Sequence, residues 1–206
     1  MVKSSSHNIT IIGSGYVGMS LATLLAKHHK VTIVDIDKEK VKKINSGISP
    51  IKDSMISDYL KNKDLNLKAT DSLNGVIDTA NLAIIATPTD YDDGTGHFDT
   101  SSVDKVVEEI LQHNIKALIV IKSTIPEGHT DFLKTKYKTN NILFSPEFLR
   151  EGQALQDNLY PSRIIIGSKC SNAELFANIL QEASLKKDVD ILFTSSKEAE
   201  AIKLFS

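Results

Sequence analysis

The segment "IIGSGYVGMSLATLL", from Ile11 to Leu25, decides the fold class of this chain. It places Gly13, Gly15 and Gly18 in a GxGxxG pattern between an apolar run and a helical period. In such a unit the first glycine allows a tight turn, the second lets the backbone approach a pyrophosphate, and the third lets helix and strand pack closely. The helix N-terminus also offers unpaired N–H groups to an anion. The segment therefore predicts a dinucleotide-binding unit.

Outward from this segment, short β-branched runs alternate with helical periods along most of the chain. Most of the runs are continuously apolar, which is typical of parallel strands whose sheet is covered by helices on both faces. The expected strands span residues 8–12, 30–35, 82–87, 117–122, 141–144 and 163–167. This order predicts an α/β fold with a Rossmann-like, doubly wound, mainly parallel sheet and helices on both faces.

An acidic residue, Asp35, ends the second expected strand, close to the usual ~20-residue offset from the glycines. A carboxylate there accepts hydrogen bonds from the ribose hydroxyls and repels a 2′-phosphate, so Asp35 favours NAD over NADP. Lys38 and Lys40 follow and soften this preference slightly. A glycine turn without a ligand is one alternative. FAD is another, although the segment "IIATPT" at the end of the strand at 82–87 argues against it.

Composition and charge narrow the class of protein further. The 206 residues carry a net charge of −2, and they suffice for one large domain, or one domain and the start of another. Runs such as "ALIVI" are too short to span a bilayer, and the first residues do not form a signal peptide. We therefore expect a cytoplasmic protein that binds neither nucleic acid nor membrane.

Cysteine and histidine usage argues against metal and disulfide chemistry. A single cysteine, Cys170, excludes an internal disulfide, and the six histidines lack the spacing of metal ligands. We therefore expect no metal site. The adjacent His28 and His29 stand where the first helix should end, where a favourable interaction with the helix dipole is the simplest interpretation.

Three later strand ends combine a proline with small hydroxyl residues. They are "ATPTDY" (86–91), "KSTIPEG" (122–128) and "SPEFLREG" (145–152). Ligands of open α/β sheets lie outside the carboxyl ends of the strands, so these segments are predicted to line one crevice. Thr89 and Thr124 would then contact a cofactor or a reacting water. A helix cap at Thr124 is the alternative interpretation.

Two glutamates lie in the last of these segments. Glu147 and Glu151 would share one face if "EFLRE" makes a helical turn. The alternative is a charged helix start that is favoured by the helix dipole.

Taken together, these motifs resemble the UDP-glucose 6-dehydrogenases of the UDP-glucose/GDP-mannose dehydrogenase family. The resemblance runs from about Asn8 to Phe205, through GSGYVG, DID, ATPT, KSTIP, SPEFLREG, ALQDNLYPSRIIIG and EAEAIKLF. It implies NAD-dependent oxidation of UDP-glucose to UDP-glucuronate, a step toward polysaccharides. GDP-mannose dehydrogenases keep the glutamate segment more closely than relatives selective for N-acetylated sugars do, so they are the nearest alternative; dehydrogenases of UDP-N-acetyl-hexosamines are another.

The resemblance implies two hydride transfers to NAD, with a cysteine thiolate that holds the aldehyde as a thiohemiacetal and then as a thioester. It implies catalytic roles for Thr124, Glu147 and Glu151, and an oxyanion-stabilising role for Lys203. The implied NAD-binding residues are Gly13, Gly15, Tyr16, Val17, Gly18, Asp35, Lys40, Thr89, Thr124 and Glu151. The implied nucleotide-sugar site comprises Glu147, Phe148, Leu149, Arg150, Glu151 and Lys203.

One departure from the family pattern concerns the nucleophile. In the family it lies in a Gly-rich segment of the C-terminal half, and "GSKCSNAEL" around Cys170 does not match that segment. Cys170 is therefore expected to be an inert residue at a helix start. We expect residues 1–195 to form the NAD-binding domain and 196–206 to begin a helix that leads to a further region and builds a homodimer. These 206 residues alone are then expected to bind NAD without completing catalysis.

Two other classes of function stay open. A relative of the β-hydroxyacid dehydrogenases would use a lysine as general catalyst, but KSTIPEG and PEFLREG fit that class poorly. A dinucleotide-sensing module without chemistry is the other alternative. The presence of Thr124, Glu147, Glu151 and Lys203 argues against it, because a sensor does not need residues that position water.

Overall fold

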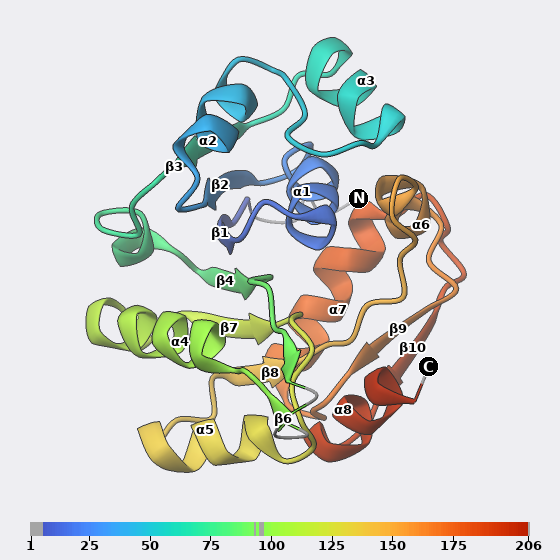
Figure 1. Cartoon of the computed structure of the whole chain (residues 1–206). Coiled ribbons are helices and arrows are strands. Elements are labelled where there is room, and N and C mark those ends of the chain that lie inside the picture. Colours follow the sequence, from blue (N-terminus) through green and yellow to red (C-terminus); the bar gives the residue numbers. More distant parts are fainter. Residues whose placement is uncertain (1–5, 93, 95–96, 206) are drawn as a thin grey trace.

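The centre of the molecule is a six-stranded parallel sheet with the strand order β3-β2-β1-β4-β7-β8 (Figure 1). The computed structural model describes residues 6–92, 94 and 97–205. The strands are β1 (Asn8–Ile12), β2 (Lys30–Val34), β3 (Leu67–Thr70), β4 (Leu82–Ile85), β7 (Leu118–Ile121) and β8 (Ile142–Phe144). This order is that of the classic dinucleotide-binding fold, so the predicted fold class is confirmed.

Helices cover both faces of this sheet. The helices of one face are α1 (Tyr16–Leu25), α2 (Lys38–Asn45), α3 (Ser54–Asn62), α6 (Ala154–Leu159) and α7 (Ser171–Ala183). Those of the other are α4 (Ser101–His113), α5 (His129–Tyr137) and α8 (Ser196–Leu204), with a 3₁₀ turn at Ile77–Thr79. Each face of the sheet thus has its own hydrophobic core, the first under α1 and α7 and the second under α4 and α5. In β4, the Ile84 side chain packs in the first core and the Ile85 side chain packs in the second. Two covered faces explain why the strands are apolar throughout.

Several elements differ from the sequence prediction. The short strands β3 and β10 (Asp190–Phe193) were not predicted. The predicted strand β9 (Arg163–Ile166) pairs with β10 in a separate two-stranded sheet, and the Gly167 amide joins it to the Phe144 carbonyl of β8 at 2.8 Å.

The polar loop after β4 contains two short paired strands, β5 (Tyr91–Asp92) and β6 (His97–Phe98). The predicted loop positions 93, 95 and 96 lie outside the described residues. None of the helices in the described part of the chain is long and apolar enough to cross a membrane.

Close backbone contact sets the position of α1 against β1. Gly13 has a φ of +102°, which a residue with a side chain rarely adopts. A Cβ on Gly18 would overlap the carbonyl group of Gly13. Gly15 differs, because a Cβ there would meet no atom within 4 Å. The three glycines therefore have separate roles. Gly13 and Gly18 allow the backbone of the turn and of α1 to pack closely, and Gly15 leaves open space at the start of α1.

Substitution by alanine should separate these roles. Gly18→Ala should lower the free energy of unfolding by about 2–3 kcal/mol, because the new methyl group meets backbone that cannot move aside. Gly15→Ala should leave it within about 0.5 kcal/mol of wild type, because the site is open. Urea unfolding followed by circular dichroism measures both values. Equal stability of the two variants would contradict the close packing of α1.

His29, after the end of α1, is buried with an exposure of 2%. The His7 amide donates to His29 Nδ1 at 3.4 Å. Burial, and then the neighbouring His7 and His28, lower the pKa of His29 to about 4. The imidazole is therefore neutral near neutral pH. The predicted interaction of a charged His29 with the helix dipole is wrong, because burial outweighs it.

Acid should destabilise the fold through this histidine. Between about pH 6.5 and about pH 4 the unfolded chain protonates His29 while the folded chain does not, so the free energy of unfolding should fall as the pH falls through this range. His29→Gln should flatten this part of the pH profile, and His113→Gln, at a half-exposed histidine, should not. Urea unfolding at a series of pH values provides the comparison. Identical profiles for wild type and His29→Gln would rule out this source of acid sensitivity.

Candidate functional site

The strand order reverses between β1 and β4, and the candidate site lies at the carboxyl ends of these strands. The Gly13 amide donates to the Val34 carbonyl at 2.8 Å, and the Ala86 amide donates to the Ile12 carbonyl at 2.8 Å. The turn after β1 is thus held between the ends of β2 and β4. A reversal of strand order of this kind is where open α/β sheets bind ligands.

The start of α1 has the features of an anion site. Gly15 is the N-cap residue and supplies no side-chain hydrogen bond, and the first turn of α1 has no acidic residue. The first amides of a helix lack partners within the helix, so those of Tyr16 and Val17 are available to a ligand. Both residues are half-buried and Gly15 is exposed. A diphosphate group fits this open, uncapped helix start.

Asp35 follows β2 and lies against the same turn. Its carboxylate accepts hydrogen bonds from the Ser14 amide (2.8 Å), the Ser14 hydroxyl and the Asp37 amide (2.9 Å). Partial burial raises the pKa of Asp35, but the hydrogen bonds from Ser14 and Asp37 and the charge of Lys40 together hold it below its usual value. Asp35 is therefore an ionised, fixed acceptor. Sequence reasoning missed Ser14, whose only signal was a hydroxyl between the first two glycines.

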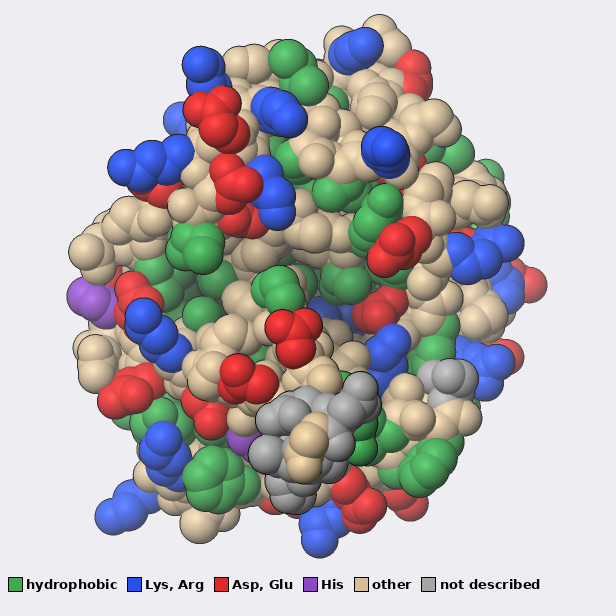
Figure 2. Space-filling model, viewed as in Figure 1, with side chains coloured by type: hydrophobic (Ala, Val, Ile, Leu, Met, Phe, Trp, Pro, Cys, Tyr) green, Lys and Arg blue, Asp and Glu red, His purple; other side chains and the backbone are tan. Residues whose placement is uncertain are grey.

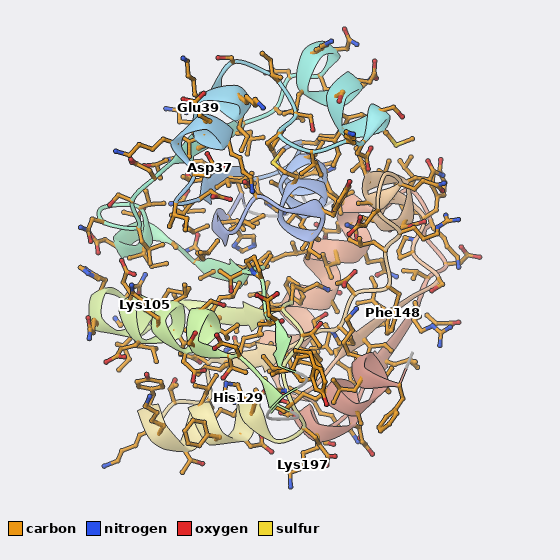
Figure 3. All side chains as sticks on the ribbon, in the orientation of Figure 1. Asp37, Glu39, Lys105, His129, Phe148 and Lys197 are labelled. Atoms are coloured by element: carbon orange, nitrogen blue, oxygen red, sulfur yellow. The ribbon has the colours of Figure 1, made fainter. Side chains whose placement is uncertain are left out.

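The start of α2 forms the next part of this edge. The Asp37 side chain caps α2 by accepting from the amides of Glu39 (2.9 Å) and Lys40 (3.2 Å). Figure 3 shows Asp37 and Glu39 beside the start of α2, well separated from Phe148. Lys40 is half-buried. The structure thus brings Lys40 to the same side as Asp35, as the resemblance implies.

The ends of β4 and β7 are tied to each other. The Ser123 hydroxyl donates to the Thr87 carbonyl at 2.7 Å. Thr89 and Thr124 follow these strands, and both are half-buried. The helix-cap interpretation of Thr124 is wrong, because α5 begins only at His129 with Gly128 as its N-cap.

The segment from Ser145 to Gly152 is a loop without helical structure. The helical turn that would place Glu147 and Glu151 on one face is therefore absent from this segment, and the alternative of a charged helix start is wrong, since α6 begins at Ala154. Glu147 is mostly buried, whereas Glu151 is exposed. Within residues 6–92, 94 and 97–205, no hydrogen bond or ion pair joins Glu151 to Glu147 or Thr124.

Glu147 instead pairs with Lys203 of α8. Lys203 Nζ lies 2.8 Å from Glu147 Oε1 and 3.0 Å from the Glu147 carbonyl oxygen. The two side chains are only 15% and 20% exposed, so water screens this pair weakly. The other carboxylate oxygen accepts from the Leu149 amide at 3.0 Å. The structure thus joins two of the predicted catalytic residues, which are far apart in sequence.

A cavity of about 230 Å³ lies beside this loop. Glu147, Phe148, Leu149 and Arg150 line it together with residues from α1, α6, α7 and the segment that leads into β9. The Arg150 guanidinium donates a hydrogen bond to Asp157 Oδ1 at 2.7 Å, and the Arg150 backbone amide donates to Asp157 Oδ2 at 2.8 Å. These contacts fix the backbone of the predicted nucleotide-sugar site.

Cys170 is an exposed thiol at the N-cap position of α7. Partial burial raises the pKa of this thiol, but hydrogen bonds from Ser168 and nearby amides together bring it below its usual value. A lower pKa increases the thiolate fraction, and the expectation that Cys170 is inert stays a prediction. Its position as a helix-start residue is as predicted.

The surface seen in Figure 2 has acidic and basic side chains interspersed, without one large field of a single sign.

The fold, the switch in strand order and the uncapped glycine turn together define a dinucleotide-binding domain of the Rossmann class. The model of the UDP-glucose/GDP-mannose dehydrogenase family, NAD binding domain, matches residues 7–184. The chain belongs to this family.

Two curated relatives are UDP-glucose 6-dehydrogenases. The one from Streptococcus pneumoniae is 50% identical over 204 residues, which is 96% of this chain and 52% of the relative. The one from Campylobacter jejuni is 45% identical over 200 residues, 96% of this chain and 51% of the relative. The chain thus spans about half the length of the curated relatives it matches.

Solved structures agree on the fold. A UDP-glucose dehydrogenase from Pyrobaculum islandicum is 25% identical with a TM-score of 0.85, over 98% of this chain and 49% of that one. A GDP-mannose dehydrogenase from Pseudomonas aeruginosa is 24% identical with a TM-score of 0.83, over 96% of this chain and 48% of that one. The family description makes NAD the cofactor, and the open space at Gly15 and the ionised Asp35 fit it.

Removal of the Asp35 charge should weaken cofactor selection. Asp35→Asn should raise the Kd for NAD about tenfold, since a charged hydrogen-bond partner is lost, and should narrow the preference for NAD over NADP. Asp37→Asn removes the same charge two residues away but keeps a good cap for α2, so its Kd should stay within about twofold. Calorimetric titration gives both constants. A wild-type Kd for NAD in Asp35→Asn would exclude Asp35 from the binding site.

Proposed function

We propose that this chain supplies the NAD-binding domain of an enzyme that oxidises UDP-glucose to UDP-glucuronate. The observation that carries the proposal is the Glu147–Lys203 pair, which lies on the sheet edge that also carries the dinucleotide turn. The 50% identity to a UDP-glucose 6-dehydrogenase supports the choice of substrate. Bound NAD would accept hydride in this reaction.

In the proposed arrangement the chain holds NAD through its backbone and one carboxylate. The amides at the start of α1, at Tyr16 and Val17, bind the diphosphate, with Gly15 leaving room for it. Asp35 accepts from the adenosine ribose, and Lys40 lies near it. Thr89 and Thr124 extend the contact along the sheet edge toward the nicotinamide. Asp35 is already fixed by Ser14, so it needs little reorganisation on binding.

Four residues act on the substrate in this proposal. Glu147 exchanges protons with the sugar hydroxyl or with the hydrolytic water, and Lys203 stabilises negative charge on the substrate oxygen. Lys203 is already charge-paired and mostly buried, so it is held in one place before substrate arrives. Thr124 and Glu151 hold a water near the nicotinamide. Glu151 is exposed and can turn toward a bound ligand.

The nucleotide sugar is proposed to lie against the loop from Glu147 to Glu151. Phe148, Leu149 and Arg150 line the cavity of about 230 Å³, and the amides of Leu149 and Arg150 are already held by Glu147 and Asp157, so the loop keeps one shape beside the ligand. The Arg163 guanidinium lies 6.0 Å from the centre of the Phe148 ring and supports the loop from β9. GDP-mannose and UDP-N-acetyl-hexosamines are the competing substrates, and direct comparison of their binding decides among them.

The wider assignments are also proposals. We place the domain boundary near residue 195, although α8 packs on the second core through the buried Ala199. We also propose a cytoplasmic location and, from the resemblance, assembly of the enzyme as a homodimer.

The polypeptide Met1–Ser206 should bind NAD but should not reduce it with UDP-glucose. Its one cysteine, Cys170, is the N-cap of α7 and does not match the family nucleophile. Calorimetry with NAD and NADP, and the absorbance of NADH with UDP-glucose, test both statements. Absence of NAD binding would refute the cofactor role. NADH formation by this polypeptide would refute the statement that it lacks the nucleophile needed for catalysis. Binding of UDP-glucose would distinguish an enzyme domain from a dinucleotide sensor, which has no substrate site.

A further inference from the structure

Two lysines hold neighbouring carbonyl groups of the loop between β8 and α6. Lys203 of α8 donates to the Glu147 carbonyl at 3.0 Å. Lys122, at the end of β7, donates to the Pro146 carbonyl at 3.0 Å. The loop has no helical or strand hydrogen bonding here, so contacts from outside set the path of its backbone. The sequence interpretation included Lys122 in a motif but gave it no role.

Lys122 connects three elements. Its ammonium group also lies 3.4 Å from the Ser145 hydroxyl, which in turn donates to the Ile165 carbonyl of β9 at 2.8 Å. Lys122 therefore ties the end of β7 to the loop and, through Ser145, to β9. An ammonium group has three N–H donors, and within the described part of the chain only these two acceptors are found. Lys122 also lines the cavity of about 230 Å³.

The burial of this charge requires an explanation. Lys122 is only 6% exposed, and it has no direct carboxylate partner among residues 6–92, 94 and 97–205. The charged groups around it are Glu147 on the loop and Lys203 on α8, and Arg150, Asp157 and Arg163 line the same cavity. A buried charge without a close counterion usually costs stability, so the fold does not gain from it.

We propose that Lys122 is a positioning residue of this site: its ammonium group holds the Pro146 carbonyl and so fixes the backbone that presents Glu147 to a nucleotide sugar. The identity of that ligand rests on the proposed function. When Lys203 shares its N–H donors with a substrate oxygen, its hold on the Glu147 carbonyl weakens. Lys122 then keeps the start of the loop in place.

The geometry has a consequence for pH. The pKa of Lys122 is lowered to about 8, mainly by burial; the charge of Glu147 opposes this shift and the charge of Lys203 adds to it. Above that pH the group becomes a neutral amine, which is a weaker donor to the Pro146 carbonyl. The loop should therefore change its conformation or mobility as the pH rises through about 8. Below that pH the buried charge opposes folding, because the unfolded lysine binds its proton more tightly.

Backbone amide NMR from about pH 6 to about pH 10 tests the proposal. In the wild-type polypeptide the amide signals of residues 147–151 should shift together with a midpoint of about 8. Lys122→Met should abolish this titration and should not lower the free energy of unfolding. Lys116→Met, at an exposed lysine that precedes β7, should retain it. Loop signals that do not titrate, or that titrate equally in Lys122→Met, would overturn the proposal.

A second measurement does not depend on the variant. In wild-type protein labelled at the lysine Cε, one lysine signal should titrate with the midpoint of the loop amides. If every lysine signal titrates near 10.5, the ordinary value, the proposal is wrong. NAD affinity, measured on the same samples, reports on the proposed function separately. Loss of NAD binding with an intact loop titration would refute that function and leave the positioning role standing.

Discussion

The close approach of α1 to the turn after β1 is the contact on which the site depends. The Gly13 carbonyl occupies the space that a side chain at Gly18 would need, and a side chain at Gly13 would overlap the carbonyl of Ala86. The helix start is thereby held between the ends of β2 and β4, and the Ser14 amide of the same turn donates to the ionised Asp35. The same packing that stabilises the sheet thus aims the positive end of a helix dipole at the crevice.

The other half of the site depends on how α8 is anchored. Glu200 is fully buried and accepts from the amides of Gly128 (2.6 Å) and Thr130 (2.8 Å) and from the Thr130 hydroxyl (2.5 Å). This carboxylate ties α8 to the loop that follows Thr124. Lys203, one turn further along α8, is then directed at Glu147. Residues from β7, β8 and α8 therefore meet through a small number of buried polar contacts.

Much of the fold could be predicted from the sequence, because local patterns encode it. The glycine pattern, the apolar strands and Asp35 all lie within short segments whose geometry is set by neighbours in the chain. The strand β3 was missed because an edge strand with the exposed Lys68 lacks a continuous apolar run. The sequence left open whether the segment around Glu147 makes a helical turn, since spacing alone cannot show that the partner of Glu147 is Lys203, 56 residues away.

Residues whose roles depend on burial could not be predicted at all. Lys122 and His29 look like ordinary polar residues in sequence, and only their surroundings show that burial lowers the pKa of each. Ser14 acquires its role only when the end of β2 lies beside the glycine turn. In each case one would need to know which segments, distant in sequence, pack around the residue. Composition and periodicity do not contain this information.

A crystal structure of the NAD complex tests the central claim most directly. The account predicts that the diphosphate accepts hydrogen bonds from the amides of Tyr16 and Val17, with the adenosine ribose on Asp35 and the nicotinamide on the side of Thr124. A diphosphate bound away from the start of α1, or a nicotinamide that points away from Thr124 and Glu147, would contradict it.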